Sequence, residues 1–273
     1  HAQKALKCSM ACGAHGLPLM GCGDWNDGMN SVGEQGRGES VWLGWFLAAI
    51  IRDWIPISKT MDDRQFAQEI TQYLQELEQN LNLNAWDGEW FRRAYFDDGT
   101  PLGTKNATEC QIDSISQSWA VLSGAAETVK CQKALLSARR LLIDEKHKLI
   151  KLLSPPFDCV RPSPGYIQGY APGIRENGGQ YTHAALWLIM AYARMGPPGE
   201  AERLWDMINP IRHTETKTEA DRFETEPYVI SADVYTALGL EGKGGWSWYT
   251  GAAGWMYRVA VEEILGIKRE ENR

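Results

Sequence analysis

Apolar residues recur along this chain with the three-to-four-residue spacing of α-helices. Segments 39–54 and 180–194 are apolar on every side and are therefore expected to be buried, whereas segment 61–81 has one apolar and one polar face. Five further segments are predicted to be helical, namely residues 2–11, 112–126, 131–144, 200–208 and 249–265. The pattern therefore predicts an all-α fold.

Irregular segments rich in glycine, proline and polar residues separate these helices. The predicted non-helical segments are the long loops 13–38 and 155–179, the loop or small hairpin 86–99 with its turn at 97–99, the polar loop 214–226, the helical or extended segment 227–236 and the charged tail 268–273. Because long loops precede the buried helices and the composition does not shift, we expect residues 1–273 to form a single domain. A toroid of paired helices with a loop-built pocket at one end fits this order.

The 273-residue chain has an ordinary globular composition, with 44% hydrophobic residues, 23% charged residues and a net charge of −7. An acidic chain without a basic stripe is not expected to bind nucleic acid or an anionic membrane surface. The apolar stretch 41–51 is too short to span a bilayer, so no membrane segment is predicted. Six cysteines lack the spacing of a metal site, and a cytoplasmic protein with reduced thiols is the simplest interpretation. Neither a metal nor another cofactor is expected.

Residues 23–30, Gly-Asp-Trp-Asn-Asp-Gly-Met-Asn, place two carboxylates and an indole in a glycine-flanked loop ahead of a buried helix. Cleavage of a glycosidic bond needs a carboxylic acid near the leaving oxygen, and a sugar ring packs well on a flat apolar face. Asp24 and Asp27 are the candidate acids, one of which could instead be a structural hydrogen-bond acceptor. Trp25 and Trp248 are the tryptophans predicted to line a pocket, since both lie in loops. A tight turn that caps the next helix is the competing interpretation.

A second loop, residues 165–183, carries Tyr170, Arg175 and Glu176 and runs into the buried helix that bears His183. Arginine and glutamate offer polar groups for sugar hydroxyls, and tyrosine offers a ring for stacking. A histidine near the start of an otherwise apolar helix is often a core residue. The preceding Glu-Asn-Gly-Gly sequence favours a functional role for His183.

The third candidate is the predicted helix start at Thr250 and Gly251. Exposed N–H groups and the helix dipole favour an anion there, and glycine lets an anion approach the backbone closely. An ordinary threonine cap is the alternative. An acid, a sugar pocket and an anion site without a clear second base favour phosphorolysis, in which inorganic phosphate is the nucleophile. P-loop, dinucleotide-binding, zinc-protease and nucleophile-elbow motifs are absent from the sequence.

Five stretches carry a family resemblance: GLPLMGCGDWNDGMN…GRGESVWLGWFL, WFRRAYFDDGTPLG, IDSISQSWAVLSGAA, GYAPGIRENGGQYTHAALW and GGWSWYTGAAGWMYR. Over about residues 14–266 the chain resembles the cellobiose-phosphorylase-type family, glycoside hydrolase family 94. Within that family it is most similar to the C-terminal domain of cyclic β-1,2-glucan synthases and to β-1,2-oligoglucan phosphorylases. The resemblance implies an (α/α)6 barrel and inverting phosphorolysis of β-linked glucooligosaccharides to α-glucose 1-phosphate.

The resemblance also implies roles for single residues. By position, Asp27 is the general acid, Trp25, Arg175 and Glu176 surround the donor sugar, Tyr170 lies near the acceptor sugar, and His183, Thr250 and Gly251 bind phosphate. The cellobiose enzymes carry lysine at position 175 and a glutamine shortly after the EPYV-like stretch, where this chain has Ser231-Ala232-Asp233. Both departures fit the β-1,2-glucan branch.

These predicted helices make only the C-terminal half of a twelve-helix barrel. We therefore expect a partial catalytic domain, partnered by the missing N-terminal part of its module or by a second copy, with little activity in isolation. It is expected in the cytoplasm, either free or within a membrane-anchored synthase. Two functional alternatives stay open: an inverting hydrolase with Glu176 or Asp24 as the base, and a non-catalytic module that binds glucan or controls chain length.

Overall fold

The computed structural model describes residues 1–269 and shows a mainly helical chain. The α-helices are α1 (Ala2–Ser9), α2 (Val41–Thr60), α3 (Arg64–Asn84), α4 (Ser114–Leu122), α5 (Thr128–Leu142), α6 (Thr182–Met195), α7 (Glu200–Met207), α8 (Lys217–Phe223) and α9 (Thr250–Arg258). Short 3-10 segments are η1 (Asp27–Met29), η2 (Tyr166–Gly169) and η3 (Pro210–His213), and the π-helix η4 (Val259–Ile264) continues α9. The helices predicted from the apolar pattern are confirmed. Residues 270–273 of the predicted charged tail lie outside the described residues.

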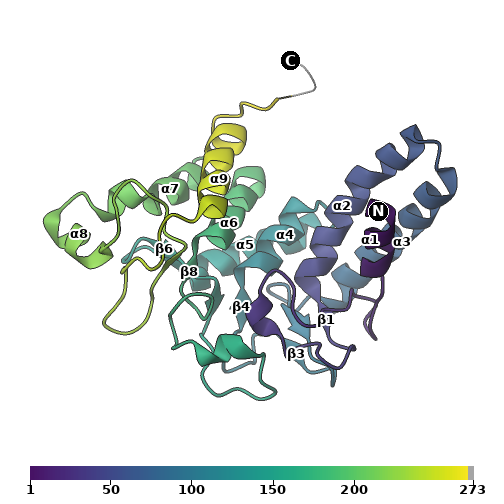
Figure 1. Cartoon of the computed structure of the whole chain (residues 1–273), viewed down its shortest axis with the longest axis horizontal. Helices are drawn as coiled ribbons and strands as arrows, with labels where there is room; N and C mark the ends of the chain where they lie inside the picture. Colours follow the sequence, from purple (N-terminus) through teal and green to yellow (C-terminus); the bar gives the residue numbers. More distant parts are fainter. Residues whose placement is uncertain (270–273) are drawn as a thin grey trace.

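Pairs of two-residue strands join the loops at one end of the helices. The strands are β1 (Glu39–Ser40), β2 (Ala94–Tyr95), β3 (Pro101–Leu102), β4 (Ile112–Asp113), β5 (Ile143–Asp144), β6 (Leu149–Ile150), β7 (Leu153–Ser154), β8 (Gln180–Tyr181) and β9 (Asp233–Val234). They pair antiparallel in the orders β1-β2-β3, β4-β7, β5-β6 and β8-β9. Figure 1 shows β1, β3, β4 and β8 below helices α2, α4 and α6. The small hairpin predicted around the turn at 97–99 is formed by β2 and β3. The all-α prediction did not include the other strand pairs, most of which join residues far apart in the sequence.

Helix α2 extends beyond the predicted end at Trp54 and continues through Pro56 to Thr60. At its start, Ser40 Oγ accepts a hydrogen bond from Leu43 N at 2.9 Å, which satisfies one of the free first-turn donors. The helix is long and apolar enough, by length and composition, to cross a membrane. It packs against α3 and α4, and side chains such as Trp45 are fully buried in the core. Packing within the protein thus buries 44% of its apolar window, while Ile57 near its end is 45% exposed.

Two predicted boundaries need correction. The segment 214–226 is not only a polar loop, because it contains α8, which begins with a capping box between Thr216 and Glu219. Each of these side chains accepts a hydrogen bond from the other residue's backbone N–H at 3.2 Å, and this pattern could have been read from the sequence. The segment 227–236 proves to be extended around β9, which pairs with β8.

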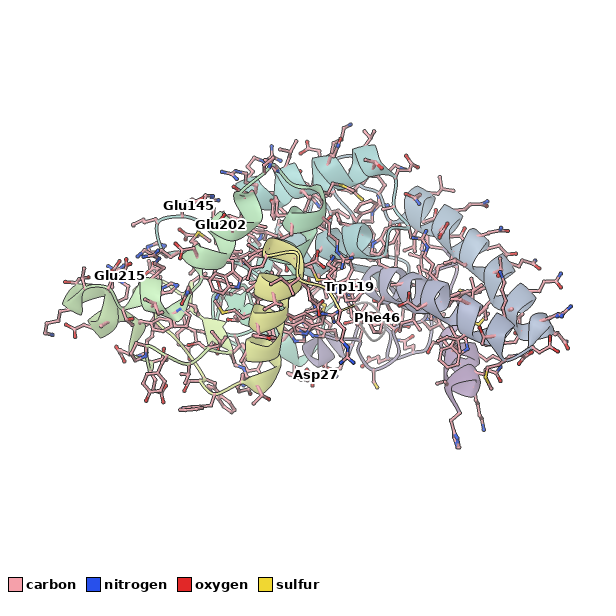
Figure 2. All side chains as sticks on the ribbon, turned by 90° about the horizontal axis from the view of Figure 1, so that it is seen from above. Asp27, Phe46, Trp119, Glu145, Glu202 and Glu215 are labelled. Carbon is pink, nitrogen blue, oxygen red and sulfur yellow. The ribbon has the colours of Figure 1, made fainter. Side chains whose placement is uncertain are left out.

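Three of the four buried clusters among the described residues bear on the site. The largest lies among helices α2 to α7 and includes the fully buried Trp45 and Ile70. An aromatic cluster places Trp42 and Trp119 around Phe46, with ring centroids 5.1 and 5.0 Å away. Seen from above, Phe46, Trp119 and Asp27 lie near the middle of the molecule (Figure 2). The third cluster lies under the loops, so these loops rest on a core of their own.

Candidate active site

Asp24 is held by a buried arginine. Its carboxylate accepts hydrogen bonds from Arg93 Nη1 at 2.7 Å and from Arg93 Nη2 at 2.6 Å. Ser40 Oγ donates a further bond at 2.6 Å, and Asn26 N donates one at 3.0 Å. Arg93 Nε also donates a hydrogen bond to Asp113. Burial raises the pKa of Asp113 to about 6, although the positive charge of Arg93 acts to lower it. With its oxygens engaged in this way, Asp24 is a structural acceptor and not a free base.

Asp27 has the opposite surroundings, although it lies only three residues further along the chain. It is the first residue of η1, and it is exposed. Asn26 Oδ1 caps the turn by accepting a hydrogen bond from Gly28 N at 3.2 Å. The Tyr166 hydroxyl and the Glu176 carboxyl are both close enough to the Asp27 carboxylate to interact with it, and this interaction helps to raise the pKa of each of the two groups. Of the two aspartates, Asp27 is the one that can meet a substrate.

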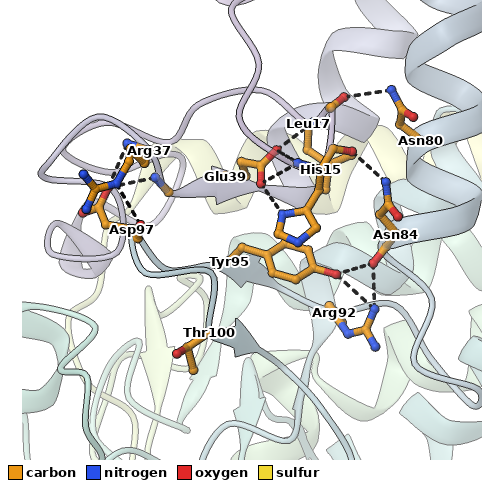
Figure 3. A network of polar contacts seen from close by, with 12 residues as sticks. His15, Leu17, Arg37, Glu39, Asn80, Asn84, Arg92, Tyr95, Asp97 and Thr100 are labelled. Atoms are coloured by element: carbon orange, nitrogen blue, oxygen red, sulfur yellow. Dashed lines mark hydrogen bonds and ion pairs between the residues drawn. The ribbon is translucent and has the colours of Figure 1, made fainter.

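Polar contacts fix the segment that carries this loop (Figure 3). Glu39 accepts hydrogen bonds from His15 N and from Leu17 N, each at 3.0 Å, and its Oε2 lies 2.5 Å from His15 Nδ1. At the far side, Asp97 accepts three bonds of 2.8–2.9 Å from backbone N–H groups of segment 35–38. The loop between residues 13 and 38 is therefore held at both ends, which allows it to present Asp27 in a defined position.

Trp25 and His183 are neighbours in the structure. The Trp25 ring packs edge-on against Tyr181 and His183, with centroids 5.4 and 5.6 Å away. His183 also contacts Trp187 at 4.4 Å and Trp255 at 5.9 Å. Burial among these rings lowers the pKa of His183 to about 4, so the imidazole is neutral at neutral pH. Its Nε2 atom is buried and has no hydrogen-bond partner among residues 1–269.

Arg175 lies between two aromatic rings. Its guanidinium carbon is 5.1 Å from the Tyr170 centroid and 4.9 Å from the Trp246 centroid, and its Nε is 3.5 Å from Glu176 Oε2. The residue has a φ of 51°, a left-handed conformation that non-glycine residues adopt mainly where the surroundings enforce it. Burial raises the pKa of Glu176, and it raises that of the nearby Asp233 to about 6. Arginine, glutamate and two rings form a surface suited to sugar hydroxyls and ring faces.

The start of α9 is open. Thr250 is the first helical residue, and Tyr249 occupies the capping position without a side-chain cap bond. Thr250 and Gly251 are exposed, and a Cβ atom added at Gly251 would meet no atom within 4 Å. Helix α9 packs against α6, which bears His183. Tyr249 also contributes to raising the pKa of Tyr181 to about 12, after the larger effects of burial and of Glu176. First-turn N–H groups of α9 are thus uncapped near the start of α6.

Sequence reasoning did not assign a role to Arg93, Tyr166 or Asp233, although all three contact or face predicted site residues. A charged residue between apolar neighbours, as in Phe91-Arg-Arg-Ala94, was the available signal for Arg93. Asp233 lies in a strand, and its partner residue in the neighbouring strand is Tyr181. Among the described residues no group of three His, Cys, Asp or Glu side chains is placed to hold a metal ion.

The family can now be identified. The model of the glycosyl hydrolase 94 superfamily catalytic domain matches residues 1–266. The chain belongs to this superfamily. It is 45% identical over 274 residues to the cyclic β-(1,2)-glucan synthase NdvB of Rhizobium meliloti, covering 100% of this chain and 10% of that protein. It is 33% identical over 257 residues to the solabiose phosphorylase of Paenibacillus borealis, covering 93% of this chain and 33% of that protein.

The chain is also similar to a further phosphorylase and to a solved hydrolase structure. A 1,2-β-oligoglucan phosphorylase of Listeria innocua is 31% identical over 112 residues, which cover 36% of this chain and 10% of that protein. The GH63 mannosylglycerate hydrolase of Thermus thermophilus, solved with glucose, has a TM-score of 0.52 at 17% identity. That match covers 81% of this chain and 48% of the hydrolase chain, and it shows similarity of fold alone. The chain spans a third or less of the length of these curated relatives.

Proposed function

We propose that this chain is the part of a glycoside phosphorylase module that carries the acid and the phosphate site. The reaction is inverting phosphorolysis of β-linked glucooligosaccharides, with β-1,2-glucan as the substrate class, to α-glucose 1-phosphate. One observation carries the proposal: the loop that exposes Asp27 also packs Trp25 against the neutral imidazole of His183. Membership of the superfamily and the 45% identity to a cyclic β-(1,2)-glucan synthase support the substrate class.

In the proposed reaction Asp27 gives its proton to the glycosidic oxygen as the bond from that oxygen to the anomeric carbon breaks. A phosphate oxygen attacks the anomeric carbon from the opposite face, which inverts its configuration. The phosphate is held by His183, whose neutral ring can donate one hydrogen bond, and by the backbone N–H groups at Thr250 and Gly251. Inorganic phosphate is a co-substrate in this scheme, which requires no cofactor.

The sugar units are assigned to the remaining predicted residues. Trp25, Arg175 and Glu176 hold the donor glucose, and Tyr170 stacks on the acceptor glucose. The arginine between two rings supports this assignment, because a planar guanidinium fixed by stacking presents its N–H donors in a defined direction. The Glu176 Oε2 atom, which lacks a hydrogen-bond partner among the described residues, supports a role in accepting a bond from a sugar hydroxyl.

The chain forms part of an (α/α)6 barrel that further helices of the same module, or a second copy, complete. Relatives three or more times as long support this view. So do large apolar side chains left in solvent, among them Trp246, Trp248 and Tyr257 with 58%, 66% and 72% exposure. On this view residues 1–273 alone have little activity. The exposed free thiols of Cys8, Cys12, Cys22 and Cys159 fit a reducing cytoplasm, free or at the inner face of a membrane.

The deciding experiment incubates the intact protein with β-1,2-glucooligosaccharides in the presence and absence of phosphate. Formation of glucose 1-phosphate that depends on phosphate supports the proposal. Phosphate-independent release of free glucose would instead favour an inverting hydrolase with Glu176 as the base, a role consistent with its buried carboxyl. Oligosaccharide binding without turnover in either condition would favour a non-catalytic glucan-binding or chain-length-controlling module.

A further inference from the structure

The acid loop is joined to the start of the loop 165–183, at Tyr166, a residue to which the sequence analysis assigned no role. Ser31 N donates a hydrogen bond to Pro164 O at 3.1 Å, and Tyr166 N donates one to Asn30 Oδ1 at 3.0 Å. Both bonds connect the residues just after η1 with those at the start of η2, although some 130 residues separate them in the sequence. The two short helical turns are therefore attached to each other.

Glycines make this contact close. Gly165 has a φ of 126°, and a Cβ atom there would lie 2.4 Å from Asn30 Oδ1 and 2.8 Å from Gly28 O. From the other side, a Cβ atom at Gly28 would lie 3.0 Å from Ile167 Cβ. Backbone thus packs directly on backbone, and Ile167 is fully buried beneath the contact. Tyr166 sits between Gly165 and Ile167, so the position of its backbone relative to η1 is fixed.

The Tyr166 side chain uses this position to reach Asp27. Its hydroxyl interacts with the Asp27 carboxylate closely enough to raise the pKa of the phenol, while its ring packs edge-on against Tyr170 with centroids 6.2 Å apart. Burial and the Asp27 carboxylate raise the pKa of Tyr166 to about 12, so the phenol keeps its proton and acts as the donor at neutral pH. Half of the Tyr166 surface remains exposed, as expected for a residue at the edge of an open site.

Groups on two neighbouring elements act on Asp27. Tyr166 faces it from η2, and Glu176 faces it from the following loop, where Arg175 and Asp233 in turn act on Glu176 and on each other. Asp24, on the same loop as Asp27, is bound by Arg93. Tyr166 therefore offers a donor to the Asp27 carboxylate, while Glu176 repels negative charge there.

We propose that Tyr166 is a positioning residue that directs the Asp27 carboxyl at the glycosidic oxygen and stabilises the carboxylate left after proton transfer. This inference rests on the proposed role of Asp27 as the acid. A hydrogen bond to a charged acceptor is about twice as strong as one to a neutral acceptor. The Tyr166 bond therefore strengthens as Asp27 loses its proton, which favours the transition state over the ground state.

The test replaces Tyr166 by phenylalanine in the intact protein and follows the reaction rate against pH. The Tyr166→Phe variant keeps the ring and loses only the donor, so kcat is expected to fall by about tenfold. The rate falls at high pH when the acid loses its proton, and removal of a donor to the carboxylate favours the protonated form. The basic limb of the profile should therefore move to higher pH by about half a unit or more. Tyr228→Phe is the matched control, because Tyr228 is 76% exposed and is expected to leave rate and profile unchanged.

An unshifted basic limb in a folded Tyr166→Phe protein overturns the inference, even if its unfolding midpoint has dropped. Failure of the proposed function would give a different result. The unmodified protein would then release sugar in the absence of phosphate, or the Asp27→Asn variant would release as much sugar as the unmodified protein. If the reaction proves to be hydrolysis, the same pH comparison still decides the role of Tyr166, because an inverting hydrolase also needs the acid. Asp27→Asn, measured in parallel, establishes whether that acid is Asp27.

Discussion

Arg93 and Asp24 form a two-pronged ion pair in which both side chains are completely buried. The two bonds measure 2.7 and 2.6 Å, and the exposure of each side chain is 0%. A buried ion pair adds little net stability compared with apolar packing, since both charges lose their hydration. Its consequence here is geometric. The pair attaches Asp24, in the loop that exposes Asp27, to Arg93, which directly precedes β2.

Removal of one partner of this pair should be costly. Arg93→Met leaves Asp24 and Asp113 buried without their counter-ion, and we expect a loss of about 3–5 kcal/mol in the free energy of unfolding. Arg64→Met is the control, because the pair between Arg64 and Asp62 is 88% and 80% exposed and should contribute little. Urea denaturation of both variants measures the difference. Equal stabilities would show that the buried arginine is not needed to balance the two carboxylates.

Asp27→Asn should abolish most of the activity while leaving the fold intact. Asparagine has a similar shape but cannot give a proton, so turnover is expected to fall by about 10²–10⁴-fold. Asp98→Asn serves as the control, since Asp98 lies in an exposed turn and bonds only locally to Thr100. Assays of glucose 1-phosphate formation under identical conditions test this. A variant at position 27 with nearly full activity would exclude this side chain as the acid.

Gly165 should tolerate no side chain, in contrast to Gly169 at the end of the 3-10 segment that follows it. Gly165→Ala would place a Cβ atom 2.4 Å from Asn30 Oδ1 in a left-handed conformation, whereas a Cβ atom at Gly169 meets nothing within 4 Å. We expect Gly165→Ala to lower the free energy of unfolding by about 1–3 kcal/mol and Gly169→Ala to have little effect. Thermal unfolding of the two variants, together with their turnover rates, tests whether the two loops act as one unit.

Acid should destabilise the protein through His213. This side chain stacks on Phe223 in the interior, and burial together with the nearby Lys148 lowers its pKa to about 4. An unfolded histidine binds a proton near pH 6.5, so the unfolded state gains protons before the folded state as the pH falls. Stability is therefore complete above about pH 6.5 and decreases between about pH 6.5 and 4, by as much as about 3 kcal/mol.

The His213→Gln variant lacks this ionisation and should show a flatter dependence of unfolding free energy on pH over the same range. His183→Gln should remove a second contribution of the same sign, because the pKa of His183 is also lowered to about 4. Urea titrations between pH 4 and 7 provide the measurement. An unchanged slope in both variants would mean that other groups are responsible for any acid sensitivity.

The sequence by itself determined the helices and the segments that carry the chemistry. Apolar periodicity located α2, α3 and α6, because burial of one face depends on spacing along the chain. The motifs placed Asp27 and His183 in separate segments beside buried helices, and the family that they indicated is confirmed. Helix α8 was also within reach, since its capping box is a local pattern.

Only the tertiary structure decided which residues meet. Asp24 and Asp27 look alike in sequence, and Arg93, some seventy residues away, makes the first a structural acceptor. Tyr166 lies beside Asp27 because two distant loops pack backbone to backbone. The short strands depend in the same way on partners from other parts of the chain. Contacts of this kind depend on how loops are placed by the packed helices beneath them, and no local spacing rule encodes that placement.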